Sequence, residues 1–355
     1  MKVLIVSGSS GGHIFPAIAL LEELNKRNNR GSCLLVIPRK KYSFGLGLQP
    51  SEVRYITFVR STTKSVSLLA GSLWSLLKSF LESFFIIIEF KPQAVVGFGT
   101  ITSVPVVFWA WLLRIKTIIH EQNVIPGRAN MILARIVDVI AVSFPETAAY
   151  INDCRQRVEL VGNPLRKNMR LIAKDKAFAF FGLNQGKFTI LVVGGSQGSK
   201  RINLAILEAL TGLDGASRIQ VLHLGTGDDY AVLEKGYRSL GVDFRLFPFL
   251  KEMEYAYSAS DLVICRAGAT TIAELLYFHK PAIIIPYPYA YNHQMANAAI
   301  MESRGLARII EDPKLDEGLL QICIQDMMNR PLDMSQLIAP QFDARQRLAD
   351  TLLSL

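Results

Sequence analysis

The sequence predicts an α/β protein of two domains, each built on a parallel β-sheet that helices cover on both faces. Short apolar runs alternate with longer stretches in which apolar residues recur every three to four positions. This pattern is typical of buried parallel strands and their connecting helices. It occurs twice, because a glycine-rich turn between an apolar strand and a helix begins each half of the 355-residue chain. We therefore expect two Rossmann-like domains of ordinary size.

The N-terminal half contains apolar runs that predict strands at residues 2–7, 32–37, 53–58, 93–97, 116–120, 138–142 and 158–161. Helical periodicity lies between them, at residues 14–28, 65–89, 101–113 and 127–135. Residues 66–90 are the most hydrophobic of these stretches and about long enough to span a bilayer. Their polar residues, Ser75, Lys78, Ser79, Glu82 and Glu89, fall along one helical face. We expect an amphipathic helix packed on the sheet, with direct membrane contact as the alternative and a transmembrane helix disfavoured.

The C-terminal half repeats the alternation of strands and helices. Its predicted strands are residues 187–193, 218–224, 242–247, 261–265, 281–285 and 305–309, and its predicted helices are 200–212, 228–240, 251–258, 270–279, 292–304 and 314–329. The joint falls near Gly162-Asn163-Pro164, directly after a strand. We expect an N-terminal domain of residues 1–162 and a C-terminal domain of residues 163–338. For the last helical segment, residues 339–355, we consider a return onto the first domain.

Composition narrows the possible function classes. Half of the residues are hydrophobic and 19% are charged, which is too apolar for a disordered chain. The four cysteines are far apart and form no CxxC motif, which favours reduced thiols in the cytoplasm over disulfides or a zinc site. Met1 leads directly into a strand, so we expect no secretory signal. The five histidines are well separated, and we expect neither a metal nor a cofactor.

Basic residues are concentrated in the N-terminal half. Residues 1–160 contain 18 lysines and arginines against 10 acidic residues, whereas the remainder contains 21 against 20. This excess suits a phosphorylated substrate or an anionic membrane surface. Nucleic acid is not an expected partner, because the basic residues are not interleaved with aromatic ones and no RNA- or DNA-binding module is recognisable.

Two glycine-rich turns are the first candidate binding sites. Ser7-Gly8-Ser9-Ser10-Gly11-Gly12-His13 follows the first strand, and Gly194-Gly195-Ser196-Gln197-Gly198 follows the first strand of the second half. Glycine lets a ligand approach the backbone closely, and a helix N-terminus presents amides and a partial positive charge that suit phosphate. Neither turn fits GxGxxG, and no GxxxxGK[ST] exists, so dinucleotide oxidoreductases and P-loop NTPases are disfavoured. A simple tight turn remains the alternative for each.

A third candidate site lies between Arg266 and Ala298. Gly268 and Ala269 end a predicted strand, and Thr270 and Thr271 begin a helix, which again places amides beside a possible phosphate. Glu274 lies one turn into that helix, where a carboxylate suits the two hydroxyls of a ribose. Diphosphate and ribose recognition together indicate a nucleotide-sugar site, whereas a helix-capping glutamate is the alternative.

The complete set of motifs resembles the MurG family. These GT-B glycosyltransferases move N-acetylglucosamine (GlcNAc) from UDP-GlcNAc onto undecaprenyl-pyrophosphoryl-MurNAc-pentapeptide (lipid I), which gives lipid II. The matching motifs span nearly the whole chain: Ser10-Gly11-Gly12-His13, Ile119-His120-Glu121-Gln122-Asn123, Ser143-Phe144-Pro145-Glu146, Gly162-Asn163-Pro164-Leu165-Arg166, Val193-Gly194-Gly195-Ser196-Gln197-Gly198, Arg266-Ala267-Gly268-Ala269, and His293-Gln294 through Asn297-Ala298.

The resemblance implies a donor site in the C-terminal domain and an acceptor site in the N-terminal domain. The donor residues that it implies are Ser196, Gln197, Gly198, Ala269 and Thr270 at the diphosphate, Glu274 at the ribose, Leu250 at the uracil and Gln294 at the sugar, with Thr271, Ile272 and Ala273 as further substrate-binding residues. Ser10, Gly11 and Gly12 would lie near the sugar and the acceptor diphosphate. Asn123 and Arg166 would approach the donor from the domain junction.

The departure from the family pattern that matters lies in the second N-terminal loop; the first loop differs only in beginning Gly8-Ser9-Ser10 where the family has Gly-Gly-Thr. The family has GxGGYxSGP where this chain has Gly97-Phe98-Gly99-Thr100-Ile101-Thr102-Ser103-Val104-Pro105, so Thr100 and Val104 replace glycines and the aromatic residue is gone. We therefore expect a less open loop beside the acceptor diphosphate.

The reaction needs a base for the acceptor hydroxyl, and histidine has the ordinary pKa that suits this task. His13 is the first candidate and Glu121 the second, while helix N-termini, Ser196 and Arg166 would stabilise the leaving diphosphate. The alternatives are another GT-B enzyme that uses a UDP-sugar, such as a glycolipid transferase or a UDP-GlcNAc epimerase, or a regulator that binds a nucleotide sugar without turnover.

A lipid acceptor implies work at a membrane. We expect peripheral binding to the cytoplasmic face of the bacterial plasma membrane through the basic N-terminal domain. An apolar patch of residues 98–101, with Phe108 and Trp109, would insert shallowly beside it.

Overall fold

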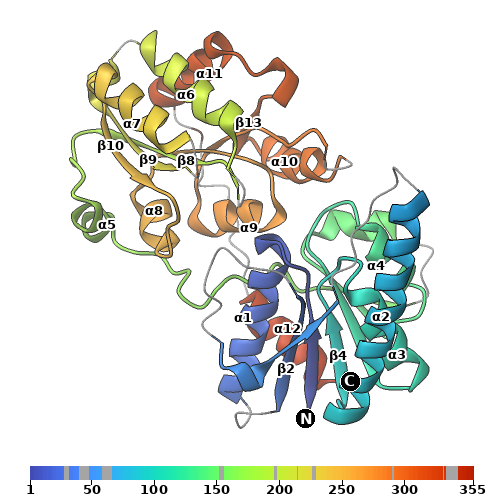
Figure 1. Ribbon diagram of the computed structural model, residues 1–355. Coiled ribbons are helices and arrows are strands. Elements are labelled where there is room, and N and C mark those ends of the chain that lie inside the picture. Colours follow the sequence, from blue (N-terminus) through green and yellow to red (C-terminus); the bar gives the residue numbers. More distant parts are fainter. Residues whose placement is uncertain are drawn as a thin grey trace. The chain divides into compact units, whose positions relative to one another are not determined.

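The computed structural model describes residues 1–27, 32–39, 48–57, 66–151, 156–195, 198–213, 215–225, 229–289, 292–330, 332 and 343–355 (Figure 1). The chain divides into two compact units. The first comprises Met1–Arg166 and Phe342–Leu355, and the second comprises Lys167–Gln341. Each is a parallel sheet covered by helices, which confirms the predicted fold class of two Rossmann-like domains.

The first unit contains a seven-stranded sheet in the order β3-β2-β1-β4-β5-β6-β7, and all of its strand pairs are parallel. Its strands are β1 (Val3–Val6), β2 (Cys33–Pro38), β3 (Val53–Ile56), β4 (Ala94–Gly97), β5 (Lys116–Glu121), β6 (Val139–Val142) and β7 (Arg157–Leu160). The strand order reverses between β1 and β4, where Val6 pairs with Gly97. Ligands bind beyond the carboxyl ends of the strands at such a switch point.

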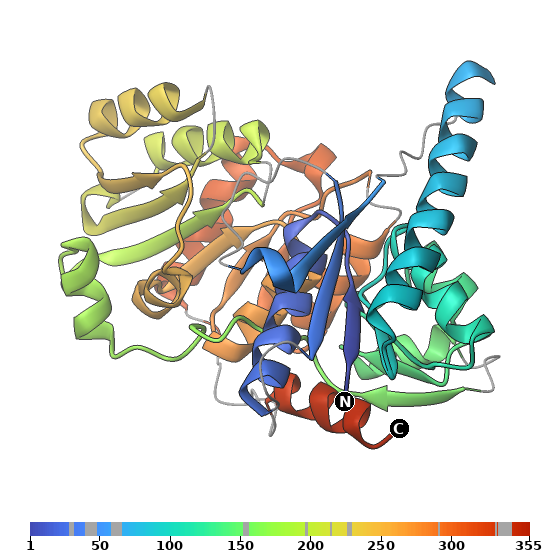
Figure 2. The ribbon, with the colours of Figure 1, turned by 60° about the horizontal axis from the view of Figure 1, so that its bottom comes forward.

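Helices cover both faces of this sheet, and every residue of β1 is therefore buried. Val3 and Ile5 face α1 (Gly11–Arg27) and α12 (Ala344–Leu353), whereas Leu4 and Val6 lie in the opposite core. That second core is covered by α2 (Val66–Phe90), α3 (Ser103–Leu112) and α4 (Arg128–Leu133). The C-terminal helix α12 therefore completes the core of the first unit. Figure 2 shows α12 lying beside α1.

The helix α2 differs from the predicted arrangement of its faces. Ser79 and Ser83 are fully buried, while Leu73, Trp74, Leu77, Leu81, Phe85 and Ile88 are 47–71% exposed. Both serines are small, and the Ser83 hydroxyl is satisfied within the helix, where it donates to the Ser79 carbonyl at 2.6 Å. Trp109 of α3 donates its indole N–H to the Phe80 carbonyl at 2.9 Å. Among the described residues, no helix is both long and apolar enough to cross a membrane.

The second unit repeats the design with a six-stranded parallel sheet in the order β10-β9-β8-β11-β12-β13. Its strands are β8 (Phe188–Val193), β9 (Ile219–Leu224), β10 (Asp243–Phe247), β11 (Leu262–Cys265), β12 (Ala282–Ile284) and β13 (Ala307–Ile309). Its helices are α5 (Lys174–Phe181), α6 (Lys200–Thr211), α7 (Asp229–Leu240), α8 (Met253–Ala259), α9 (Ala269–Phe278), α10 (His293–Ser303) and α11 (Glu317–Asn329). The switch point lies between β8 and β11, where Val193 pairs with Cys265.

Each predicted strand overlaps a strand of the structure, but two helices differ from the prediction. The helix α5 was not predicted, because its N-cap residue, Ala173, offers no capping side chain and its last residues are aromatic. The helix α1 begins at Gly11 rather than Ile14, because the Ser10 carbonyl accepts the amides of both His13 and Ile14 at 3.0 Å. The described residues also contain the short 3-10 helices η1 (Pro50–Glu52), η2 (Pro145–Tyr150), η3 (Ala216–Arg218) and η4 (Asp312–Lys314).

Candidate active site

The first glycine turn connects β1 to α1 at the switch point of the first sheet. Because α1 begins at Gly11, the amides of Gly11 and Gly12 point out of its N-terminal end beside Ser10, as phosphate recognition requires. Gly8 has to be glycine, because a Cβ atom there would overlap the side chain of Thr100 from the loop after β4. The two loops at the switch point are therefore packed directly against each other.

The second loop carries the chain's departure from the family pattern. Thr100 has a φ of 68°, a left-handed conformation that β-branched residues rarely adopt. Its Oγ1 is buried and has no hydrogen-bond partner among the described residues. Its side chain fills the space beside Gly8 that a glycine would leave empty. Phe98 is fully buried, so the predicted insertion of this residue into a membrane is wrong.

His13 lies in the first turn of α1 and is connected to β5 by hydrogen bonds. Its Nδ1 atom lies 2.9 Å from Oε1 of Gln122, and the Nε2 amide of Gln122 donates to Nδ1 of His120 at 3.0 Å. The Nε2 atom of His120 lies 2.9 Å from the backbone carbonyl of Gly162. Two histidines are thus joined through one glutamine, and the row ends at a carbonyl in the motif Gly162-Asn163-Pro164.

Both histidines of this row are held in the neutral form. Burial lowers the pKa of His13 below its ordinary value, although the charge of Glu121 and the hydrogen bonds to Gln122 and the Phe98 carbonyl act in the opposite direction. Burial lowers the pKa of His120 to about 4, against the bond to Gly162 and together with repulsion from His13. A neutral His13 has one ring nitrogen that can accept a proton.

Glu121, the second candidate base, is surrounded by donors. Its Oε1 accepts from the backbone and side-chain N–H groups of Asn123 at 2.9 and 3.1 Å. Its Oε2 accepts from the Gly127 amide at 2.9 Å and from Nδ2 of Asn130 at 2.8 Å. Only 2% of Glu121 is exposed. The carboxylate therefore organises the loop after β5, and this arrangement does not suit proton abstraction from a substrate.

Asn123 and Arg166 lie at the same edge of the first unit. Glu121 holds Asn123, and the carbonyl of Asn123 accepts the hydroxyl of Thr147 at 3.1 Å. The guanidinium of Arg166 stacks over the ring of Phe15, one turn beyond the start of α1, at 4.9 Å. The structure thus brings Ser10, Gly11, Gly12, His13, Glu121, Asn123 and Arg166 to the carboxyl edge of one sheet.

The glycine turn of the second unit connects β8 to α6. Gly195 and Gly198 have φ values of 90° and 72°, and the Gly198 amide donates to the Gly195 carbonyl at 3.0 Å. These left-handed conformations and the tight turn explain why the motif needs glycine. The candidate residues Ser196 and Gln197 lie outside the described residues.

Arg266 connects the loops at this edge. Its guanidinium donates to the Ser199 hydroxyl at the N-terminus of α6 at 2.8 Å and to the Ile285 carbonyl after β12 at 3.1 Å. It also pairs with the carboxylate of Asp312 and lies over the ring of Tyr287. One cation therefore fixes the turn after β8 relative to the loop after β12.

The helix α9 begins directly at this edge. Ile272 donates the first intrahelical bond to the Gly268 carbonyl at 3.0 Å, so the preceding amides of Ala269, Thr270 and Thr271 point out of the helix N-terminus. Ile272 and Ala273 continue the first turn. Glu274 is 9% exposed, and its Oε2 accepts the hydroxyl of Tyr257 from α8 at 2.8 Å. Tyr257 thus fixes the orientation of the carboxylate.

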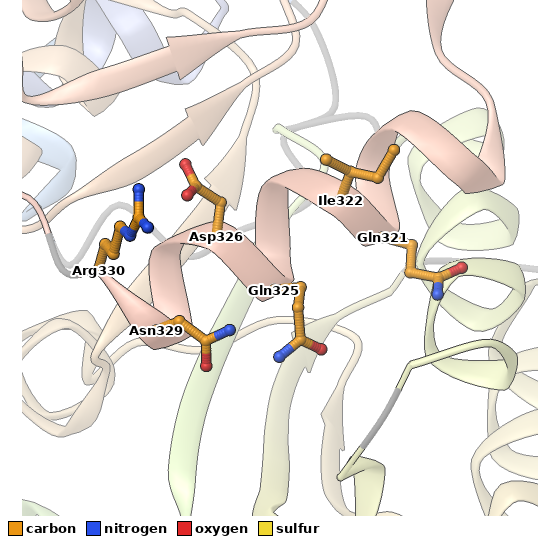
Figure 3. Close-up of a pocket in the computed structure, with 6 residues that line it drawn as sticks. All are labelled: Gln321, Ile322, Gln325, Asp326, Asn329 and Arg330. Carbon is orange, nitrogen blue, oxygen red and sulfur yellow. The ribbon is translucent and has the colours of Figure 1, made fainter.

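Gln294 and Leu250 complete the second group. Oε1 of Gln294 accepts the amides of Ala267 and Tyr287 at 3.1 and 2.9 Å, so Nε2 is the atom directed to other acceptors. Leu250 is buried in the loop after β10. These residues lie at the carboxyl edge of the second sheet. A separate hollow of about 440 Å³ lies along α11, and none of the candidate residues lines it; its lining is Gln321, Ile322, Gln325, Asp326, Asn329 and Arg330 (Figure 3).

The described residues contain no group of three or more His, Cys, Asp or Glu side chains that could hold a metal ion. Sequence reasoning assigned no role to Gln122, Asn130 or Tyr257. The motif that contains Gln122 was visible in the sequence, but the direction of its amide depends on neighbours from α1 and from Gly162. Tyr257 carried no signal, because a buried tyrosine in a short helix is ordinary core composition.

Comparison with known proteins identifies the family of this chain. Residues 3–142 match the glycosyltransferase family 28 N-terminal domain, and residues 189–351 match the glycosyltransferase family 28 C-terminal domain. A protein of Thermodesulfovibrio yellowstonii, named UDP-N-acetylglucosamine--N-acetylmuramyl-(pentapeptide) pyrophosphoryl-undecaprenol N-acetylglucosamine transferase, is 41% identical over 340 residues, which cover 95% of this chain and 92% of the relative. The chain belongs to the MurG family of glycosyltransferases.

Solved structures agree with membership of the MurG family. The crystal structure of Acinetobacter baumannii MurG has a TM-score of 0.75 and 26% sequence identity, and the match covers 100% of both chains. A UDP-GlcNAc 2-epimerase from Neisseria meningitidis, bound to UDP-GlcNAc, has a TM-score of 0.65 over 100% of both chains at 15% identity. The second likeness shows the fold alone. The resemblance to the MurG family that the sequence motifs indicate is confirmed.

Proposed function

We propose that this enzyme transfers GlcNAc from UDP-GlcNAc to the 4-hydroxyl of MurNAc in lipid I, with inversion at the anomeric carbon. The observation that carries this proposal is the 41% identity, over 92% of its length, to a relative named for that transfer. Within the chain, the support is a neutral histidine beside one helix N-terminus and an oriented carboxylate beside another.

The second unit is the donor-binding unit in this proposal. The N-termini of α6 and α9 would bind the diphosphate of UDP through backbone amides and their partial positive charge. The carboxylate of Glu274 would accept the ribose hydroxyls, and Leu250 would contact uracil through its backbone. The Nε2 donor of Gln294 would bind hydroxyls of the sugar, because Oε1 already accepts two backbone amides.

The first unit is the acceptor-binding unit, and His13 is the base. Its second ring nitrogen would take the proton of the acceptor hydroxyl while the hydroxyl oxygen bonds to the anomeric carbon and UDP leaves. Arg166 and the helix N-termini would stabilise the charge on the departing diphosphate. Glu121 would shape the loop that presents Asn123, because each of its oxygens already accepts two N–H groups.

We further propose that the first unit binds the cytoplasmic face of the plasma membrane as a peripheral protein. The large exposed residues of α2 form one stripe of the helix: Leu73, Trp74, Leu77, Leu81, Phe85 and Ile88. This apolar stripe, rather than Phe98, is the part of the unit suited to shallow insertion. Lys78 on α2 is exposed, as are Lys91 and Arg114 after α2 and α3, and these cations would attract anionic headgroups.

Replacing the base tests the chemistry. His13→Ala should lower kcat by about 10²- to 10⁴-fold, the usual contribution of a general base. The KM for UDP-GlcNAc should change little, because the role of His13 is in proton transfer from the acceptor. Steady-state kinetics with UDP-GlcNAc and lipid I measure both constants. An unchanged kcat would place the base elsewhere, and a loss of donor binding would make His13 a donor-positioning residue.

Removing the ribose acceptor tests the donor site. Glu274→Ala should weaken UDP binding by about 10- to 150-fold, the value of hydrogen bonds to a charged group. Isothermal titration calorimetry with UDP measures this directly. The matched control is Glu234→Ala, which removes an exposed carboxylate of the same unit that pairs with Arg238. Equal UDP affinity of the Glu274 variant and the control would refute the assignment.

Vesicle sedimentation tests the membrane surface. The double variant Trp74→Ser and Leu81→Ser should reduce binding to anionic vesicles at least about 10-fold, since burying each large apolar side chain contributes about 1.5–3 kcal/mol. Added salt should also weaken binding of the unaltered protein. The control is Ile322→Ser on α11 of the second unit, where the isoleucine is 66% exposed. The proposal would be contradicted if only the Ile322→Ser control lost vesicle binding. It would also be contradicted if neither added salt nor the double variant of α2 weakened vesicle binding.

A further inference from the structure

The hydrogen-bonded row from Gly162 to His13 has only one possible direction. The carbonyl of Gly162 can only accept, so Nε2 of His120 must carry the proton that it donates there, at 2.9 Å. Nδ1 of His120 is then an acceptor, and it receives an N–H of the Gln122 amide at 3.0 Å. The same amide nitrogen lies 3.1 Å from the carbonyl of His120, a second acceptor that fixes the amide in this orientation.

This direction determines the protonation of His13. With the amide nitrogen of Gln122 turned to His120, its oxygen faces Nδ1 of His13 at 2.9 Å. An amide oxygen only accepts, so Nδ1 of neutral His13 carries the proton. The lone pair of neutral His13 is therefore on Nε2, and the Phe98 carbonyl, which also bonds to His13 and only accepts, shares the Nδ1 proton. His13 is partly exposed, whereas Gln122 and His120 are 1% and 0% exposed, so water does not compete along the row.

We propose that Gln122 and His120 are positioning residues that hold His13 as its Nδ1–H tautomer and so keep Nε2 ready to accept the proton of the acceptor hydroxyl. The inference rests on the proposed function, in which His13 is the base. In the reaction the O–H bond breaks, its electron pair forms the new bond to the anomeric carbon, and the proton moves to Nε2. The bond from the anomeric carbon to UDP breaks, and UDP keeps that electron pair.

A neutral amide in this position has a different effect from a carboxylate. A carboxylate beside Nδ1 would also fix the tautomer, but its charge would favour the imidazolium and raise the pKa of His13. Gln122 fixes the tautomer without adding charge. The titratable groups that face His13 are Glu121, whose charge raises the pKa of His13, and His120, which stays neutral because burial lowers its pKa to about 4.

The tautomer can be measured without turnover. In the full-length protein labelled with ¹⁵N-histidine, the His13 signals are assigned by their loss in His13→Ala. Nδ1 should give a protonated, pyrrole-type signal and Nε2 an unprotonated, pyridine-type signal near neutral pH. Gln122→Met, which is similar in size, and His120→Phe should convert His13 to a mixture of tautomers. A His13 that carries its proton on Nε2 in the unaltered protein would overturn the inference.

A buried histidine of the second unit supplies the matched control. His223 bonds to Tyr237 at 2.8 Å and to Asn203 at 2.9 Å, and burial lowers its pKa to about 3. His223→Phe removes a buried histidine of the same kind and should leave the His13 signals unchanged. A similar change in the His13 signals in this variant would mean that they report general loosening of the fold, which would overturn the assignment to the row.

Kinetics show whether the tautomer matters. Gln122→Met should lower kcat at least about 10-fold, toward the ~10⁴-fold loss that a wrong tautomer causes in a serine protease triad, with little change in the KM for UDP-GlcNAc. Gln122→Glu should restore only part of kcat, because the carboxylate also accepts from Nδ1 of His13 but has no N–H for Nδ1 and the carbonyl of His120. It should move the acid limb of the pH–rate profile to higher pH, since it raises the pKa of His13.

The two failures are distinguishable. An unaltered protein that shows the Nδ1–H tautomer but makes no lipid II would refute the proposed function and leave the tautomer measurement standing. A full kcat in Gln122→Met, together with turnover by the unaltered protein, would refute the positioning role alone.

Discussion

The pairing of β1 with β4 is the constraint on which the candidate chemistry of the first unit depends. The sheet order reverses at this pair, so the turns after the two strands open side by side at its carboxyl edge. Gly8 lies against Thr100 there, and α1 starts at once with Gly11, which carries His13 toward the end of β5. Gln122 can therefore reach His13 although the two residues are far apart in sequence.

The second unit uses the same topology for a different task. Its edge is held by Arg266, which connects the start of α6 to the loop after β12, and by Tyr257, which orients Glu274. Both units thus place helix N-termini at a rigid sheet edge, and what differs is the group beside them. In the first unit it is a neutral imidazole, and in the second a carboxylate.

Much of this arrangement could be predicted from the sequence. The spacing of apolar residues and the positions of the glycines were sufficient to predict the strands, because buried parallel strands consist of continuous apolar runs. The position of His13 followed from the glycine turn after the first strand, and that of Glu274 from its place one turn into the helix after a later strand. The inward face of α2 could not be predicted, because serine is a polar residue, and only the packing of the first unit shows that Ser79 and Ser83 are buried. The left-handed conformation of Thr100 was likewise invisible, since β-branched residues rarely adopt it.

The different roles of Glu121 and Gln122 could not be predicted from the sequence, because they depend on which residues surround each side chain in the structure. In sequence the carboxylate has the stronger chemical signal, yet its oxygens accept N–H groups from Asn123, Gly127 and Asn130. The adjacent amide, which has no ionisable group, is the residue that contacts the candidate base. The Glu121 carboxylate, which accepts four N–H groups, stabilises the loop after β5. A general base instead needs a lone pair directed at the substrate.

The central claim is a single displacement in which a neutral base activates the acceptor hydroxyl and no covalent glycosyl-enzyme forms. The most direct test is the anomeric configuration of the transferred GlcNAc, read from the proton coupling at its anomeric carbon in purified product. From the α-linked donor, one displacement predicts a β-linked GlcNAc. An α-linked product would require a second displacement or a different course of reaction, and it would contradict the role assigned to His13.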